Sequence, residues 1–106
     1  MNAWVALVLA IVLEVTATLS LKAAGGGHVL ASVVVAVGYL GSFALLAVVL
    51  RTLEIGTTYA IWAGAGTALI AAIGMIALGE AATAVKIGSL TLIVAGVVGL
   101  NLSGAH

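Results

Sequence analysis

One acidic side chain, Glu14, lies in the middle of a long apolar stretch. It is eleven residues from Ala3 and eight from Lys22, so in a helix it lies roughly 12 to 16 Å from either end of the stretch. A charge near the centre of a membrane span costs about 2.5–3.5 kcal/mol on insertion scales, and ionisable groups there are usually functional. Burial disfavours the charged form, so this carboxyl group can hold a proton in one state and balance a cation in another. Glu14 is therefore a candidate for exchanging a proton against a cation.

The side chains that share a helical face with Glu14 are mostly small. They are Leu7, Ala10, Ala17 and Thr18. In one interpretation they leave space beside the carboxyl group for a substrate, and in the other they let a second helix pack closely. A corresponding alternative holds for Glu14, which in a purely structural role would stay protonated and hydrogen-bond a neighbouring helix.

Four of the five aromatic side chains lie inside apolar stretches rather than at their ends. Tyr39 and Phe43 are four residues apart, and Tyr59 and Trp62 are three apart. A carboxylate together with aromatic faces is suited to organic cations, because each ring adds a cation–π contact of about 0.5–2 kcal/mol. The alternative is that the rings only fill space between helices.

The composition defines the elements that must position these residues. Of 106 residues, 65% are hydrophobic and 6% charged, whereas soluble domains carry roughly 25% charged residues. Four apolar stretches, at about 3–22, 29–50, 55–78 and 84–103, reach the length of about 20 residues that crosses a bilayer. We therefore expect an all-α membrane protein, with four transmembrane helices in a single domain over residues 1–106.

The same composition excludes several classes of function. Three basic and three acidic side chains give a net charge of zero, so no nucleic acid is expected as a partner. There is no cysteine, no nucleophile–base pair and no phosphate-binding loop, and His28 and His106 have no partner with which to form a metal site. We expect no enzymatic activity, no catalytic residues, no metal and no cofactor.

Small residues in the third and fourth spans are candidates for a hinge and for a helix-packing surface. Because the chain has no proline, Gly64 and Gly66 are the best candidates for a hinge in the third span. Ser89 and Gly96 are seven residues apart in the fourth span, where such a ridge favours association between helices. We assign this ridge to packing in a dimer.

The basic residues in the connections are nearly balanced between the two sides of the membrane. Lys22 and Lys86 lie on one side, and Arg51 lies on the other with both chain ends. Orientation follows the bias in basic residues, so insertion in both orientations is a consequence of this balance. The two halves show no sequence repeat, so a transport pathway with two-fold symmetry requires two chains.

These features resemble the small multidrug resistance family of transporters over essentially the whole chain. The matching segments are Leu13-Glu14-Val15 with Lys22, Gly56-Thr57-Thr58-Tyr59-Ala60-Ile61-Trp62 leading into Gly64-Ala65-Gly66, and Leu92-Ile93-Val94-Ala95-Gly96-Val97 followed by Asn101-Leu102. The sequence departs from the family in its Gly25-Gly26-Gly27 loop, in lacking a proline in the second span, and in Ser89, which replaces a glycine.

The resemblance implies an antiparallel, dual-topology homodimer that exchanges protons for cationic substrates across the bacterial inner membrane. It implies that Glu14 is the essential carboxylate, supplied once by each subunit. The residues expected to line the substrate chamber are Leu7, Ala10, Ala17, Thr18, Tyr39, Ser42, Phe43, Tyr59 and Trp62. Those expected to pack the dimer are Ser89, Leu92, Ile93, Gly96 and Val97.

The residue three positions after Glu14 indicates the branch of the family. Guanidinium exporters typically have tryptophan there, whereas this chain has Ala17. The resemblance therefore favours the quaternary-ammonium and multidrug branch, with hydrophobic cations and protons as partners. The alternatives are an exporter of guanidinium or another small cation with the same fold, a heteromeric pair with a second homologous chain, and a non-transporting membrane subunit with a structural Glu14.

Overall fold

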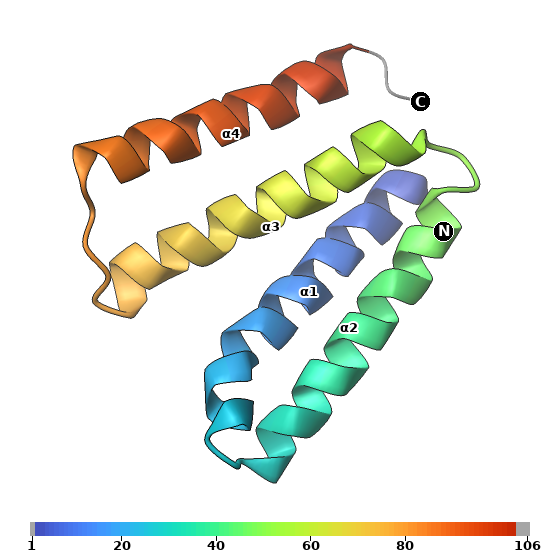
Figure 1. Cartoon of the computed structure of the whole chain (residues 1–106). Coiled ribbons are helices and arrows are strands. Elements are labelled where there is room, and N and C mark those ends of the chain that lie inside the picture. The colour runs from blue at the N-terminus through green and yellow to red at the C-terminus, as the bar shows by residue number, and fades with distance from the viewer. Residues whose placement is uncertain (1, 104–106) are drawn as a thin grey trace. The chain divides into compact units, whose positions relative to one another are not determined.

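The computed structural model describes residues 2–103, which form four α-helices joined by short connections (Figure 1). The helices are α1 (Ala3–Gly25), α2 (Val29–Val49), α3 (Ile55–Ala77) and α4 (Ala84–Leu102). Each begins at the residue where the sequence predicts a span to begin, and α1 runs three residues further than predicted. With 19 to 23 residues, the helices are about 28 to 35 Å long, and all four are apolar enough to cross a bilayer. The predicted all-α, four-span fold is confirmed.

The helices form two compact units, a hairpin of α1 and α2 and a hairpin of α3 and α4. The division falls in the connection between Leu53 and Glu54. Each hairpin is described by itself below, and a single domain over residues 1–106 stays a prediction.

Glycine and polar caps define the ends of the helices. Gly27 after α1 and Gly79 after α3 have φ angles of +94° and +73°, a left-handed conformation that residues with a Cβ adopt at a cost. The side chain of Asn2 accepts a hydrogen bond from the Trp4 N–H at the start of α1, and that of Thr83 accepts one from the Lys86 N–H at the start of α4. These caps satisfy N–H groups that have no partner within the helix.

The hairpin of α1 and α2 is closed by small residues. A Cβ added at Gly38 would lie 2.8 Å from the Cβ of Ala17 and 3.0 Å from the carbonyl oxygen of Leu13, so this position has no room for a side chain. Four residues further along α2, the buried hydroxyl of Ser42 donates a 2.7 Å hydrogen bond to the carbonyl oxygen of Ala10. Small residues four apart let helix backbones approach closely in membranes, which is how α2 holds α1.

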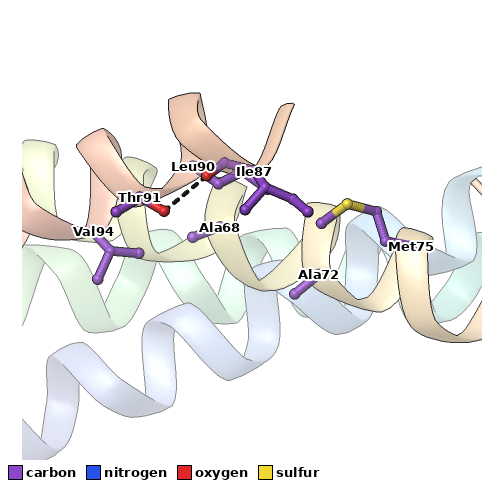
Figure 2. Close-up of a pocket in the computed structure, with 7 residues that line it drawn as sticks. All are labelled: Ala68, Ala72, Met75, Ile87, Leu90, Thr91 and Val94. Atoms are coloured by element: carbon purple, nitrogen blue, oxygen red, sulfur yellow. Dashed lines mark hydrogen bonds between the residues drawn. The ribbon is translucent and has the colours of Figure 1, made fainter. Parts of the chain in front are cut away.

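The hairpin of α3 and α4 packs less extensively. No residue of α4 is buried in the described part of the chain. Between the two helices lies an apolar groove of about 320 Å³, lined by Ala68, Ala72, Met75, Ile87, Leu90, Thr91 and Val94 (Figure 2). The one hydroxyl in this lining, that of Thr91, donates to the Ile87 carbonyl of its own helix, so the groove offers no free donor to a ligand.

Candidate proton and cation site

Glu14 lies at the centre of α1, where its side chain is half-buried. The other five charged side chains lie in the first or last turn of a helix or in a connection: Lys22, Arg51, Glu54, Glu80 and Lys86. Two of them, Glu80 and Lys86, form an ion pair at 3.7 Å across the connection before α4. Glu14 is therefore the one charged group that the described residues carry at mid-helix depth.

A short hydrogen-bonded cluster surrounds the Glu14 carboxyl group. The hydroxyl of Thr18, one turn along α1, donates to Glu14 Oε1 at 3.0 Å. The same hydroxyl lies 2.6 Å from the phenol oxygen of Tyr39 on α2. Glu14 Oε2 is buried and has no hydrogen-bond partner among residues 2–103. The structure thus brings three of the predicted site residues together and leaves one carboxyl oxygen unpartnered.

Contacts on both sides of Glu14 fix its position along α2, that is, the register of α1 against α2. The Ser42 hydrogen bond holds the backbone of Ala10 one turn before Glu14, and Gly38 packs against Ala17 about one turn after it. Ala10, Ala17 and Ser42 each have 0% exposure in this structure. These three small residues are therefore packed between α1 and α2 in this structure, and the space that Ala10 and Ala17 would leave for a substrate stays a prediction.

Several of the residues predicted to line the substrate chamber are buried in this structure. Leu7, Ala10, Ala17 and Ser42 are all buried, so a substrate could touch them only after the packing around them opens. Thr18 is half-buried and Phe43 is exposed on α2. The substrate contacts of all these residues stay predictions.

Tyr59 and Trp62 form an aromatic pair on α3. Their ring centroids are 5.7 Å apart and the ring planes are tilted by 33°, as their spacing of three residues allows. Tyr59 is 59% exposed, so its ring is accessible in this structure. Tilted rings at this separation offer an apolar surface with the negative π-faces that attract cations.

Two of the residues assigned to the dimer, Ile93 and Val97, pack on the predicted hinge of the same chain. The helix α3 runs without interruption through Gly64-Ala65-Gly66. A Cβ at Gly64 would lie 2.8 Å from Cγ2 of Val97 and 3.5 Å from that of Ile93, so these two residues face α3 of the same chain. The other three residues assigned to the dimer, Ser89, Leu92 and Gly96, are exposed along the neighbouring stripe of α4. The hinge and the dimer contact stay predictions.

Gly64→Ala should weaken the packing of α3 on α4 by about 1–3 kcal/mol, because the new methyl group overlaps Val97. Val97→Ala, in the same chain, should restore most of this stability, because it removes both Cγ methyl groups of Val97, including the Cγ2 that overlaps. Unfolding of the purified protein by titration with a denaturing detergent measures both effects. If export is still lost in the restored double variant, Gly64 has a hinge role. Equal stability of Gly64→Ala and the wild type would contradict the packing account.

Two positions were missed by reasoning from the sequence. Gly38 closes the helix pair, and its spacing of four residues from Ser42 was the available signal. The hydroxyl of Thr58 is buried without a hydrogen-bond partner in the described part of the chain, and nothing in one sequence distinguishes it from its neighbour Thr57. No group of three or more His, Cys, Asp or Glu side chains within residues 2–103 could hold a metal ion.

The fold and the site define a small multi-pass membrane protein whose central ionisable group is a carboxyl group that accepts a hydrogen bond from a threonine hydroxyl. A family described as Small Multidrug Resistance protein matches residues 2–93. The chain is 41% identical over 101 residues to a guanidinium exporter of Escherichia coli (94% of this chain, 96% of the relative). It is 44% identical over 102 residues to the multidrug resistance protein mmr of Mycolicibacterium paratuberculosis (94% and 95%), and 40% identical over 102 residues to a guanidinium exporter of Yersinia pestis (95% and 98%).

The chain belongs to the small multidrug resistance family, which confirms the resemblance inferred from its sequence. It is an exporter of this family, and its four spans and bacterial relatives place it in the bacterial inner membrane as a multi-pass protein.

Proposed function

We propose that this chain is a proton-coupled antiporter that exports lipophilic and quaternary ammonium cations by alternating access. The observation that carries the proposal is the carboxyl group of Glu14, which is half-buried at the centre of α1 and whose Oε2 has no hydrogen-bond partner among the described residues. A buried oxygen without a partner is costly, and either a proton or a cation relieves that cost.

Exchange follows if the two occupants exclude each other. The cation requires the ionised carboxylate, and protonation removes the charge that holds the cation. Each occupant then lowers the affinity for the other by the same factor, so proton entry down its gradient drives cation exit.

Ala17 supports the choice of lipophilic cations. It packs on Gly38 with no exposed surface, so a tryptophan at this position would force α1 and α2 apart. The aromatic pair of Tyr59 and Trp62, of which Tyr59 is exposed, supplies an apolar surface on which a large hydrophobic cation buries more area than a small hydrophilic one. The alternative, export of guanidinium, is favoured by the names of relatives at 40–41% identity.

The purified protein should bind tetraphenylphosphonium at least about tenfold more tightly than guanidinium. Burying roughly 60 Å² more apolar surface is enough for that ratio. Calorimetric titration of both cations in the same detergent measures the ratio, and a pH electrode in weakly buffered solution should record proton release when cation is added. Tighter binding of guanidinium would reverse the assignment of the substrate, and binding without proton release would sink the exchange mechanism.

We further propose that the working unit is an antiparallel homodimer with dual topology. The exposed stripe of Ser89, Leu92 and Gly96 on α4 supports this, because small residues let helices of two chains approach closely. Apart from its own helix turn, a Cβ at Gly96 would meet no atom of residues 2–103 within 4 Å, so the space there is open to a partner. A pair with a second homologous chain is the alternative, and the balanced basic residues of the connections favour the homodimer.

A further inference from the structure

The two oxygens of the Glu14 carboxyl group have different surroundings. Oε1 accepts the hydrogen bond from Thr18 at 3.0 Å, whereas Oε2 is buried without a partner in the described part of the chain. A carboxyl group that could rotate freely would have equivalent oxygens. The Thr18 hydroxyl removes that equivalence by holding one of them.

The direction of the hydrogen bonds follows from counting hydrogens. A threonine hydroxyl has one hydrogen and accepts through its lone pairs. Because Thr18 gives its hydrogen to Glu14 Oε1, the 2.6 Å contact with Tyr39 requires the phenol O–H to donate to Thr18 Oγ1. Both hydrogens therefore point toward the carboxyl group, in the order Tyr39, Thr18, Glu14. Bonds that donate to a carboxylate favour its ionised form.

We propose that Thr18 is a positioning residue, which holds Oε1 so that Oε2 is the atom that exchanges proton for cation. This inference rests on the proposed antiport. Tyr39 acts through the Thr18 hydroxyl, by donating to it, rather than by offering its ring to the cation. We call the hydrogen-bonded chain from Tyr39 through Thr18 to Glu14 the relay. Tyr39 is the one titratable side chain that α2 brings to it, so the phenol and the carboxyl group are the two groups of the relay that can gain or lose a proton.

The relay also suits repeated exchange. When a proton arrives at Oε2, Oε1 becomes a carbonyl oxygen that still accepts from Thr18. The side chain therefore need not turn between the two states. Without the hydroxyl, either oxygen can take the proton and the ionised form loses a hydrogen bond, so the cation should compete less well with protons.

The test removes the hydroxyl while keeping the shape of the side chain. Thr18→Val deletes the donor, Thr18→Ser keeps it, and Tyr39→Phe deletes the first hydrogen bond of the relay. Thr16→Val is the matched control, because Thr16 is exposed on the same helix and its hydroxyl donates to the Val12 carbonyl at 2.8 Å. The full-length protein is used in lipid bilayers, with Glu14→Gln to identify the infrared bands of this one carboxyl group.

Two readouts separate this inference from the proposed function. In the absence of cation, the infrared band of the ionised Glu14 carboxylate should shift in Thr18→Val and remain at the wild-type position in Thr18→Ser and Thr16→Val. With tetraphenylphosphonium, the pH at which half of the binding is lost should rise by roughly 0.5 to 1 unit in Thr18→Val and in the same direction in Tyr39→Phe. The affinity at high pH should change less than about twofold, the scale of a contact not made to the cation itself.

An unshifted band in Thr18→Val would overturn the positioning role, whatever the cation does. An equal loss of affinity at every pH would overturn it too, because that result describes a direct contact with the cation. A wild-type profile for Tyr39→Phe would overturn the relay. Absence of cation binding by the wild type would reject the proposed antiport, and the infrared bands would still decide the role of Thr18.

Discussion

Replacing Glu14 with glutamine should abolish cation binding and proton-coupled export while leaving the helical fold intact. Glutamine keeps the size of the side chain and an oxygen that accepts from Thr18, so the contact at Oε1 survives. What is lost is the charge. At 4 Å and an effective dielectric constant near 20, the attraction between a carboxylate and a monovalent cation is about 4 kcal/mol, or close to a thousandfold in affinity. Calorimetric binding and uptake into vesicles with an imposed pH gradient measure both losses.

Glu54→Gln provides the matched control for this result. Glu54 is exposed at the start of α3 and its side chain makes no capping hydrogen bond, so the same change of charge should leave binding within about twofold. Should Glu14→Gln bind and export cations like the wild type, the carboxyl group would be a structural hydrogen-bonding group and the chain a non-transporting subunit or a carrier with another coupling site.

The positions of the helices could be predicted because two simple signals agree. A span needs about 20 apolar residues, and the charged residues other than Glu14 lie at or near the connections between spans, as Lys22 does before the Gly25-Gly26-Gly27 loop and as Arg51 and Glu54 do before the third span. Boundaries were therefore closely determined at the first residue of each helix. The end of α1 was placed at Lys22, whereas the helix continues to Gly25, because alanine and a first glycine can extend the last turn before the left-handed Gly27.

Within the site, contacts along one helix could be predicted and contacts between helices could not. The spacing of four residues places Thr18 on the face of Glu14, and the 3.0 Å hydrogen bond agrees with that spacing. The bond from Tyr39 depends on the register of α2 against α1, which apolar periodicity does not encode when both helices are apolar all round.

The same limit applies to two other positions. The hydroxyl of Ser42 donates to the Ala10 carbonyl, since a hydroxyl in an apolar span bonds to whichever backbone oxygen the packing brings near, and its place in a substrate chamber stays a prediction. On α4, Ile93 and Val97 were assigned to the dimer together with Ser89 and Gly96 because the resemblance covers the segment from Leu92 to Val97. They lie about 40 to 100° around the helix from Ser89 and Gly96, at 100° per residue, and face α3.

Gly38→Ala should destabilise the hairpin of α1 and α2 by about 1–3 kcal/mol, the usual cost of overpacking. The substitution would gain up to about 1 kcal/mol of helix propensity, so any net loss must come from the overlap. That overlap involves the Cβ of Ala17 at 2.8 Å and the Leu13 carbonyl oxygen at 3.0 Å, neither of which can move without moving α1. Because Tyr39 follows Gly38 directly, a displaced helix would also lengthen the 2.6 Å contact with Thr18. Unfolding by a denaturing detergent should therefore require less detergent than for the wild type.

Gly41→Ala is the control that separates overlap from the loss of a glycine. Its added Cβ would lie 3.1 Å from Cδ1 of Leu13, the far end of a flexible side chain that can turn aside. This variant should unfold within about 0.5 kcal/mol of the wild type, or later if the gain in helix propensity prevails. If Gly38→Ala were equally stable, α1 and α2 could separate at little cost. The position of Glu14 along α2 would then not be fixed by packing, and the contact between Tyr39 and Thr18 would not be held at a constant distance.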